Sequence, residues 1–104
     1  MTQENPDRRV RKTRKLLKEC LIRLLKEKRV QDITVRELTD MADLNRGTFY
    51  LHYKDVFDLL EKTEAELMDE FNSLVMSYDA KDLKQHPALV FDDIFALVYD
   101  NADL

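Results

Sequence analysis

A run of hydrogen-bonding and charged side chains lies between residues 46 and 54, interrupted by Gly47, Phe49 and Leu51. On a short helix these groups would cover most of the circumference, which a helix built only to pack does not need. Base edges and phosphates of duplex DNA both require such donors, and the major groove admits an α-helix. The pattern therefore predicts a DNA-contacting helix. Its polar members are Arg46, Thr48, Tyr50, His52, Tyr53 and Lys54.

Several of these residues can be assigned more than one chemistry. Arg46 has the planar fork that pairs with guanine, a contact worth ~1 to 3 kcal/mol of discrimination, and its alternative is a nonspecific phosphate contact. Gly47 costs roughly 1 kcal/mol inside a helix, so we expect it to allow close approach of the backbone to DNA, unless it is merely tolerated. Lys54 needs only charge and reach to contact a phosphate. Tyr50 and Tyr53 could instead be core aromatic residues with a hydroxyl at the surface.

Capping signals place these residues on the second of two short helices joined by a tight turn. Thr34 and the Glu three residues later fit a capping box, so a helix is predicted to begin at Val35. Asp43 stands where the chain must turn, and Asp tolerates the left-handed conformation. Asn45 is a good N-cap for a helix that begins at the next residue. The apolar residues expected to be buried are Val35, Leu38, Met41 and Ala42 in the first helix and Phe49 in the second.

Hydrophobic periodicity predicts three further helices around this pair, so the fold class is all-α. The expected architecture is a three-helix, homeodomain-like helix-turn-helix domain over residues 8–54, followed over residues 55–104 by a long linking helix and at least one further helix. A polar arm is predicted over residues 1–7, in which Asp7 could cap the first helix, and that helix is predicted over 8–29, stopping near Lys28. A further helix over 55–78 is capped by Asp55 and has Phe57 in its apolar stripe. A polar connection over 79–86 then leads to a helix with a broad apolar face whose first turn holds Pro87.

The charge is divided unevenly along the 104 residues, whose net charge is -4. Residues 1–54 hold 14 Lys and Arg against 8 Asp and Glu, a net charge of +6, whereas residues 55–104 hold 3 against 13, a net charge of -10. This asymmetry indicates a polyanion-binding face backed by an acidic body, or else chance clustering of solvated charge. The same two interpretations, phosphate contact or an ordinary wet face, apply to Arg8, Arg9, Arg11, Lys12, Arg14 and Lys15.

Other classes of site find little support in the sequence. The single cysteine, Cys20, excludes an internal disulfide and is expected to be a buried small hydrophobic residue. His52 and His86 are far apart and lack spaced Cys or carboxylate partners, so no metal site is expected. No nucleophile, base and orienting group form a set, so we expect neither catalysis nor a cofactor. No apolar run is long enough to span a membrane.

Gly-Thr-Phe-Tyr at residues 47–50, followed after Leu51 by His-Tyr, resembles the DNA-binding signature of the TetR/AcrR family of bacterial transcriptional regulators. The likeness extends over about residues 10–67. It implies a helix-turn-helix whose third helix enters the major groove, a homodimer on a palindromic operator, and a larger C-terminal helical domain that binds a small-molecule inducer. The implied DNA-binding residues are Arg46, Gly47, Thr48 and Tyr50 in the groove, with Asn45 opening the helix, and Thr34, His52, Tyr53 and Lys54 toward the phosphates.

The chain departs from the family pattern at Asp43, where Gly is usual, and at Val56, where Lys is usual. Family members are also longer, so residues 55–104 would be the start of a dimerisation and effector domain that is truncated here. We expect a cytoplasmic bacterial repressor that binds double-stranded DNA. The alternatives are a helical protein–protein interaction module that uses the acidic second half, and a small-molecule sensor whose pocket two helices alone are not expected to close.

Overall fold

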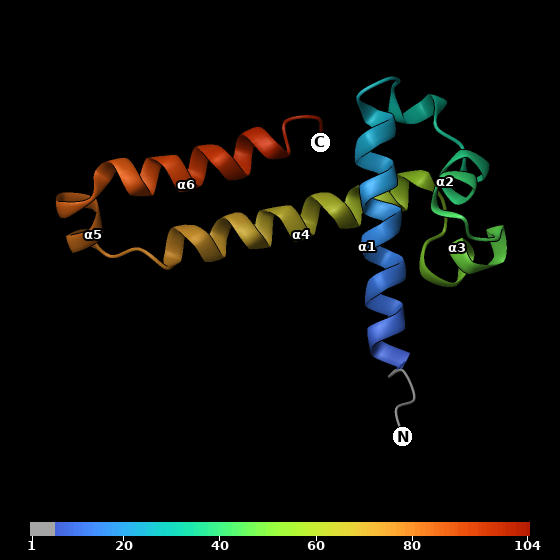
Figure 1. The fold of residues 1–104 in the computed structure, drawn as a ribbon, viewed down its shortest axis with the longest axis horizontal. Coiled ribbons are helices and arrows are strands. Elements are labelled where there is room, and N and C mark those ends of the chain that lie inside the picture. Colours follow the sequence, from blue (N-terminus) through green and yellow to red (C-terminus); the bar gives the residue numbers. More distant parts are fainter. Residues whose placement is uncertain (1–5) are drawn as a thin grey trace. The chain divides into compact units, whose positions relative to one another are not determined.

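The computed structural model describes residues 6–104, and all regular secondary structure there is helical. The predicted all-α fold class is therefore confirmed for the described part of the chain. Figure 1 shows the elements in order: α1 (Pro6–Leu25), the 3-10 helix η1 (Val30–Asp32), α2 (Val35–Ala42), α3 (Arg46–His52), α4 (Val56–Met76), α5 (Ala80–Gln85) and α6 (Pro87–Asp100).

The chain divides into two compact units, Met1–Glu61 and Lys62–Leu104. The division falls within α4, so the first turns of that helix belong to the N-terminal unit. The functional domains expected over residues 8–54 and 55–104 stay a prediction. None of the helices in the described range is both long enough and apolar enough to cross a membrane.

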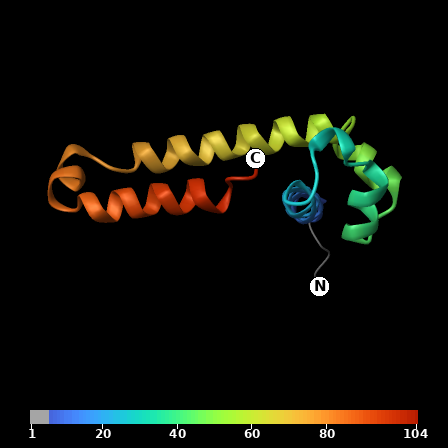
Figure 2. The ribbon, with the colours of Figure 1, turned by 90° about the horizontal axis from the view of Figure 1, so that it is seen from above.

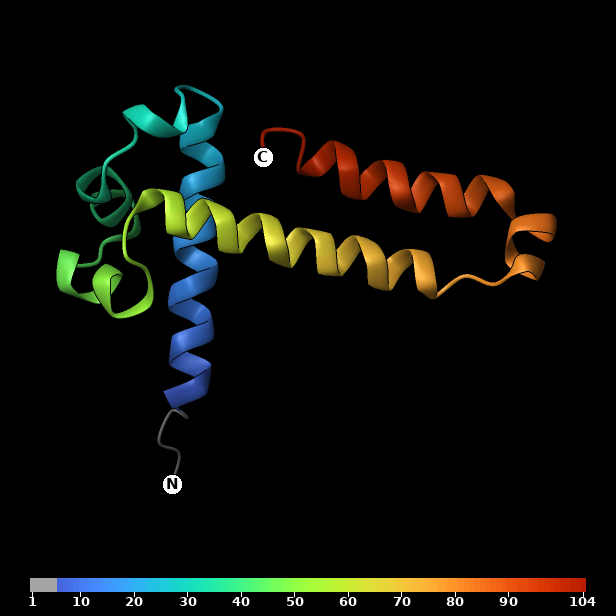
Figure 3. The same cartoon turned by 180° about the vertical axis from the view of Figure 1, so that it is seen from behind.

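The core of the N-terminal unit joins α1, α2, α3 and the start of α4. In Figure 3, α2 and α3 lie together on one side of α1. Phe49 of α3 is fully buried, as predicted, and Cys20 is buried among leucines. The buried cluster consists of Leu17, Cys20, Leu21 and Leu24 from α1, Ile33 just before α2, Leu38 and Ala42 within α2, Phe49 of α3, Tyr53 just after α3, and Val56 and Leu59 from α4.

Both predicted boundaries of the first helix were wrong by a few residues. Asp7 lies inside the first turn of α1 and not before it, because the helix already begins at Pro6. The expected arm otherwise falls on residues 1–5, which lie outside the described residues. At the other end α1 stops at Leu25 and not near Lys28. The next amides bond the carbonyls three residues back, Lys26 to Arg23 at 3.3 Å, so the last turn tightens and ends the helix.

Met41 and Phe57, both expected in buried stripes, are exposed: Met41 shows 39% of its surface and Phe57 shows 57%. In α2 the buried face is shifted by one position, because Thr39 takes a core position beside Leu38. The Thr39 hydroxyl donates to the Val35 carbonyl at 3.0 Å, which satisfies a polar group that burial would otherwise penalise. The buried face of α2 therefore includes polar Thr39, and Met41 lies outside it.

The C-terminal unit is a helical hairpin. Beyond residue 61, α4 continues to Met76, and α6 runs back antiparallel alongside it, as Figure 1 and Figure 2 both show. Pro87 lies in the first turn of α6, as predicted. The broad apolar face of α6 is mostly unburied: Val90 is covered, whereas Leu89, Phe91, Phe95 and Val98 are exposed.

The connection between the two hairpin helices differs from the predicted polar loop over 79–86. It contains α5, whose N-cap Asp79 accepts from the Asp82 amide at 2.9 Å while the Asp82 carboxylate accepts from the Asp79 amide at 3.0 Å. This reciprocal cap supplies the nucleus that so short a helix needs. It also follows an earlier end of α4, at Met76 and not at Tyr78. The Tyr78 hydroxyl instead donates to the Asp93 carboxylate of α6.

Candidate nucleic-acid interface

The start of α2 is fixed by the capping box that the sequence predicted. The Thr34 hydroxyl accepts from the Glu37 amide at 3.0 Å, and the Glu37 carboxylate accepts from the Thr34 amide at 3.2 Å. The second Glu37 oxygen accepts from the Lys28 ammonium group, which ties the segment after α1 to the first turn of α2. The hydrogen bond from Lys28 is the main cause that lowers the pKa of Glu37. The α2 helix is therefore held at its N-terminus by both local and nonlocal bonds.

The turn between α2 and α3 depends on one left-handed residue. Asp43 has φ 56° and ψ 46°, and no other non-Gly residue among residues 6–104 has a positive φ. The Leu44 amide then reaches back to the Thr39 carbonyl at 2.8 Å and closes the turn. The predicted conformation of Asp43 is confirmed, and its exposed carboxylate lies immediately before the predicted reading helix.

The first turn of α3 is organised around the side chain of Asn45. Its Oδ1 accepts from the Thr48 amide at 2.8 Å and from the Thr48 hydroxyl at 3.1 Å, so the predicted N-cap is confirmed. A Cβ atom at Gly47 would lie 3.3 Å from the same Oδ1. Gly47 therefore leaves room for the cap, a reason that the sequence did not reveal. Close approach of the Gly47 backbone to DNA stays a prediction.

Burial divides α3 into a core side and an outer side. The outer side consists of the exposed residues Arg46, Gly47, Tyr50 and Leu51. Phe49 points into the core, and the Tyr50 ring meets it edge to face at 5.4 Å between centroids. Tyr50 is 56% exposed and Leu51 is 82% exposed. Leu51 was not among the predicted site residues. Helical periodicity could have identified it, because a residue two positions after Phe49 lies on the opposite side of the helix.

The residues after α3 separate into one core residue and one surface residue. Tyr53 is 4% exposed, its hydroxyl oxygen is buried, and its ring packs on Phe49 at 5.7 Å between centroids. Burial also raises the pKa of the Tyr53 phenol. Lys54 is exposed, and its amide donates to the Asp58 carboxylate at 2.9 Å. The geometry suits Lys54 as a phosphate ligand, whereas a phosphate contact by Tyr53 would first require its side chain to move.

The start of α4 is capped as the sequence predicted. The Asp55 carboxylate accepts from the Asp58 amide at 2.8 Å, directly after Lys54. Val56, which replaces the family's usual lysine, is buried in the core of the N-terminal unit. The first turn of α4 therefore anchors the segment that follows α3 and offers no cation at residue 56.

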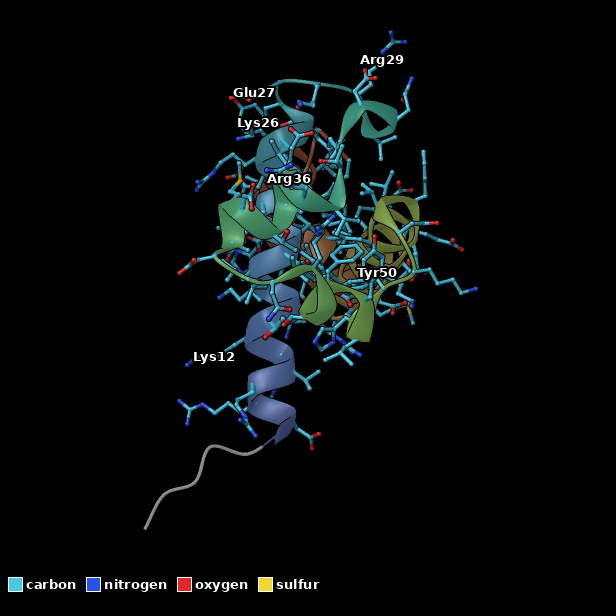
Figure 4. The ribbon with its side chains drawn as sticks, turned by 90° about the vertical axis from the view of Figure 1, so that its right-hand side faces the viewer. Lys12, Lys26, Glu27, Arg29, Arg36 and Tyr50 are labelled. Atoms are coloured by element: carbon cyan, nitrogen blue, oxygen red, sulfur yellow. The ribbon has the colours of Figure 1, made fainter. Side chains whose placement is uncertain are left out.

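Basic side chains extend well beyond α3. All six basic residues predicted near the start of α1 are exposed, and Arg14 is among them. Figure 4 shows Lys12 toward that end of α1, Lys26 and Arg29 near its opposite end, and Arg36 on α2. The Arg14 Nε donates to the His52 Nδ1 at 3.4 Å. This hydrogen bond connects the basic part of α1 to the last residue of α3.

Comparison with known proteins gives one informative similarity. The chain is 32% identical over 84 residues to a Bacillus subtilis (strain 168) protein named "Uncharacterized HTH-type transcriptional regulator YxbF". The alignment covers 72% of this chain and 22% of the relative, so the chain spans about a fifth of the length of that protein. No family model matches, and no solved structure matches. The chain is thus similar to part of a protein named as a helix-turn-helix regulator, and the TetR/AcrR family in particular is not shown.

Proposed function

We propose that this chain is a sequence-specific, double-stranded DNA-binding transcription regulator that inserts α3 into the major groove. The observation that carries this proposal is the exposed outer side of α3, formed by Arg46, Gly47, Tyr50 and Leu51. The opposite side of the same helix is held in the core by buried Phe49. The similarity to a protein named as a helix-turn-helix transcriptional regulator supports it independently.

The outer side combines the chemistries needed to distinguish base pairs. Arg46 can donate two hydrogen bonds to guanine, and Leu51 offers an apolar surface for the methyl group of thymine. Tyr50 carries a hydroxyl that can donate or accept, while Gly47 adds no side chain that would hold the backbone away from the groove. Thr48 keeps its methyl group available although its hydroxyl bonds Asn45.

Phosphate contacts would surround this reading surface and set its register. Lys54 follows α3, Thr34 opens α2, and Arg36 lies in the first turn of α2 with its Nε 3.8 Å from the Asp40 carboxylate. Such contacts fix orientation without reading sequence, and they make binding depend on salt concentration. The positive charge of residues 1–54 provides the attraction, while the acidic remainder keeps other surfaces away from DNA.

The finer features that we propose follow the resemblance to the TetR/AcrR family. They are a homodimer on a palindromic operator, repression as the mode of regulation, a bacterial cytoplasmic location, and a role without enzymatic activity. A small-molecule effector would act through residues 55–104 together with any further part of the working protein.

Selection of bound duplexes from a random pool tests the proposal directly. A recurrent sequence is expected, and a palindrome in it would support a dimer. Against the selected duplex, Arg46→Ala should relax preference at one base pair by ~1 to 3 kcal/mol. Lys54→Ala should weaken binding to all sequences and lower the salt slope by roughly one unit.

Lys81→Ala is the matched control for the lysine substitution, because Lys81 is exposed on α5 in the other unit. We expect it to leave affinity and salt slope unchanged. Parental binding by both the Arg46 and the Lys54 variants would show that α3 is not the reading helix.

A helical protein–protein interaction module is the second candidate, favoured by the exposed aromatic side chains of α6. Phe91 is 55% exposed and Phe95 is 66% exposed, and their ring centroids lie 6.4 Å apart. Absence of any salt-dependent duplex binding at ~0.1 M salt would favour this candidate over the DNA-binding one.

A further inference from the structure

The contact between Arg14 and His52 joins the basic helix α1 to the last residue of α3. The guanidinium donates its Nε hydrogen to Nδ1 of the imidazole at 3.4 Å. Nδ1 can accept only when it carries no proton, so this geometry requires a neutral ring. Burial, and then the positive charge of Arg14, lower the pKa of His52. Protonation of His52 would break the hydrogen bond and place two cations against each other.

The charged groups around the pair come from three elements. On α1, Lys18 lies near enough to Arg14 for that charge to lower the pKa of the lysine. The Tyr53 ring lies 6.2 Å from the imidazole between centroids, and Asp58 of α4 acts on the Tyr53 phenol. Arg14 is the charged residue that acts on His52 itself. The immediate electrostatic surroundings of His52 are therefore cationic.

An arginine and a histidine at the end of a groove-binding helix are well placed for a DNA backbone phosphate, because both side chains can donate to it once the imidazole is protonated. We propose that Arg14 and His52 form a proton-linked phosphate site, an inference that rests on the proposed function. When a duplex phosphate reaches the end of α3, His52 takes a proton from solvent on Nδ1. The hydrogen bond from Arg14 Nε to the ring is then broken, and the Nε–H of Arg14 becomes available to another acceptor. Both side chains then donate to the phosphate. The anion replaces the repulsion between the two cations with attraction to each of them.

This arrangement fixes the sign of the pH dependence. In the free protein the pKa of His52 is lowered, so the ring is neutral near neutral pH. A bound phosphate favours the protonated ring, which means that the complex holds more protons than its free components. Duplex affinity should therefore rise as the pH falls through the range in which His52 titrates. A rise of about one pKa unit on binding would lower Kd by up to about tenfold.

The test measures Kd by fluorescence anisotropy at constant ionic strength between about pH 7.5 and about pH 5.5, the range in which histidine titrates. The parent chain should bind more tightly at the lower pH, and His52→Gln should lose that gain. His86→Gln is the matched control, because His86 lies in the other unit and its side chain makes no capping bond to α6. It should keep the parental pH profile. Arg14→Gln should weaken binding at every pH and raise the pKa of His52, followed through its ring proton resonances.

Both a selected duplex and a random duplex are used, because a backbone site must respond to each. If the parent prefers no sequence but His52→Gln abolishes the pH dependence on both duplexes, the proposed specific function fails and the phosphate site stands. If a sequence is preferred and His52→Gln keeps the parental pH dependence, the phosphate site fails alone. Lack of binding to either duplex at low salt would overturn both.

Discussion

The turn residue Asp43 offers the sharpest test of how this helix pair is built. Its backbone is left-handed, with φ 56° and ψ 46°, and its carboxylate is exposed directly before α3. The residue therefore has two costs, one conformational and one electrostatic. Asp43→Gly removes both, whereas Asp43→Asn removes the charge and keeps a side chain that tolerates this conformation.

Glycine has no Cβ and so avoids the contact between Cβ and the following carbonyl oxygen. In the left-handed conformation this contact costs most non-Gly residues roughly 1 to 2 kcal/mol, and it costs Asp less. The greater freedom of an unfolded glycine offsets part of this gain. A net stabilisation of about 0.5 to 1 kcal/mol should remain, which corresponds to a rise in Tm of about 3 to 6 °C for a unit of this size. Removing the carboxylate also lowers repulsion from DNA. For a phosphate about 8 Å away in water, the repulsion is ~0.5 kcal/mol. Removing the carboxylate should therefore lower Kd by about twofold.

Thermal unfolding followed by circular dichroism measures the first effect, and anisotropy at low salt measures the second. Asp43→Gly should gain in both, while Asp43→Asn should match its gain in affinity with a smaller change in Tm. A lower Tm for Asp43→Gly would refute the conformational argument. Unchanged affinity in both variants at low salt would show that residue 43 does not face the DNA.

Substitutions at three further residues test the supports of the candidate interface. Phe49→Ala removes a fully buried ring and should lower the free energy of unfolding by ~3 to 5 kcal/mol in urea titrations; a loss below ~1 kcal/mol would mean that α3 is not anchored there. Asn45→Ala should cost ~1 kcal/mol because it removes the cap of α3, whereas Asn45→Asp keeps an acceptor; equal loss in both would contradict the capping role. Glu37 has a folded pKa below its ordinary value because Lys28 bonds its carboxylate, so its stabilisation is present above the unfolded pKa of about 4.3 and disappears as pH falls through the folded pKa. Glu37→Gln should flatten the acid limb of stability against pH, and an unaltered limb would show that the bond with Lys28 does not stabilise the fold.

Local features of this chain were predictable because the residues involved are neighbours in sequence. The capping box at Thr34, the left-handed Asp43 and the cap at Asn45 each depend on atoms within about one helical turn. Their geometry follows from side-chain chemistry and spacing alone. The same reasoning should have identified α5, whose cap repeats the capping-box spacing at Asp79 with a carboxylate three residues later.

Other features required the tertiary structure because they depend on contacts between distant residues or on competition for the core. Periodicity assigned Met41 to the interior, but packing against α1 selected Thr39. Burial placed Tyr53 in the core, which its residue type alone left open, whereas the outward position of Leu51 follows from helical periodicity.

The sequence by itself determined that residues 34–54 form two capped helices with a polar outer surface. It could not show that Arg14, thirty-eight positions before His52, would donate to that imidazole. Helix caps are decided within a few bonds of the backbone, whereas the partners of a side chain at a helix end are decided by which helices share a core. That physical difference separates what could be derived about α3 from what had to be observed.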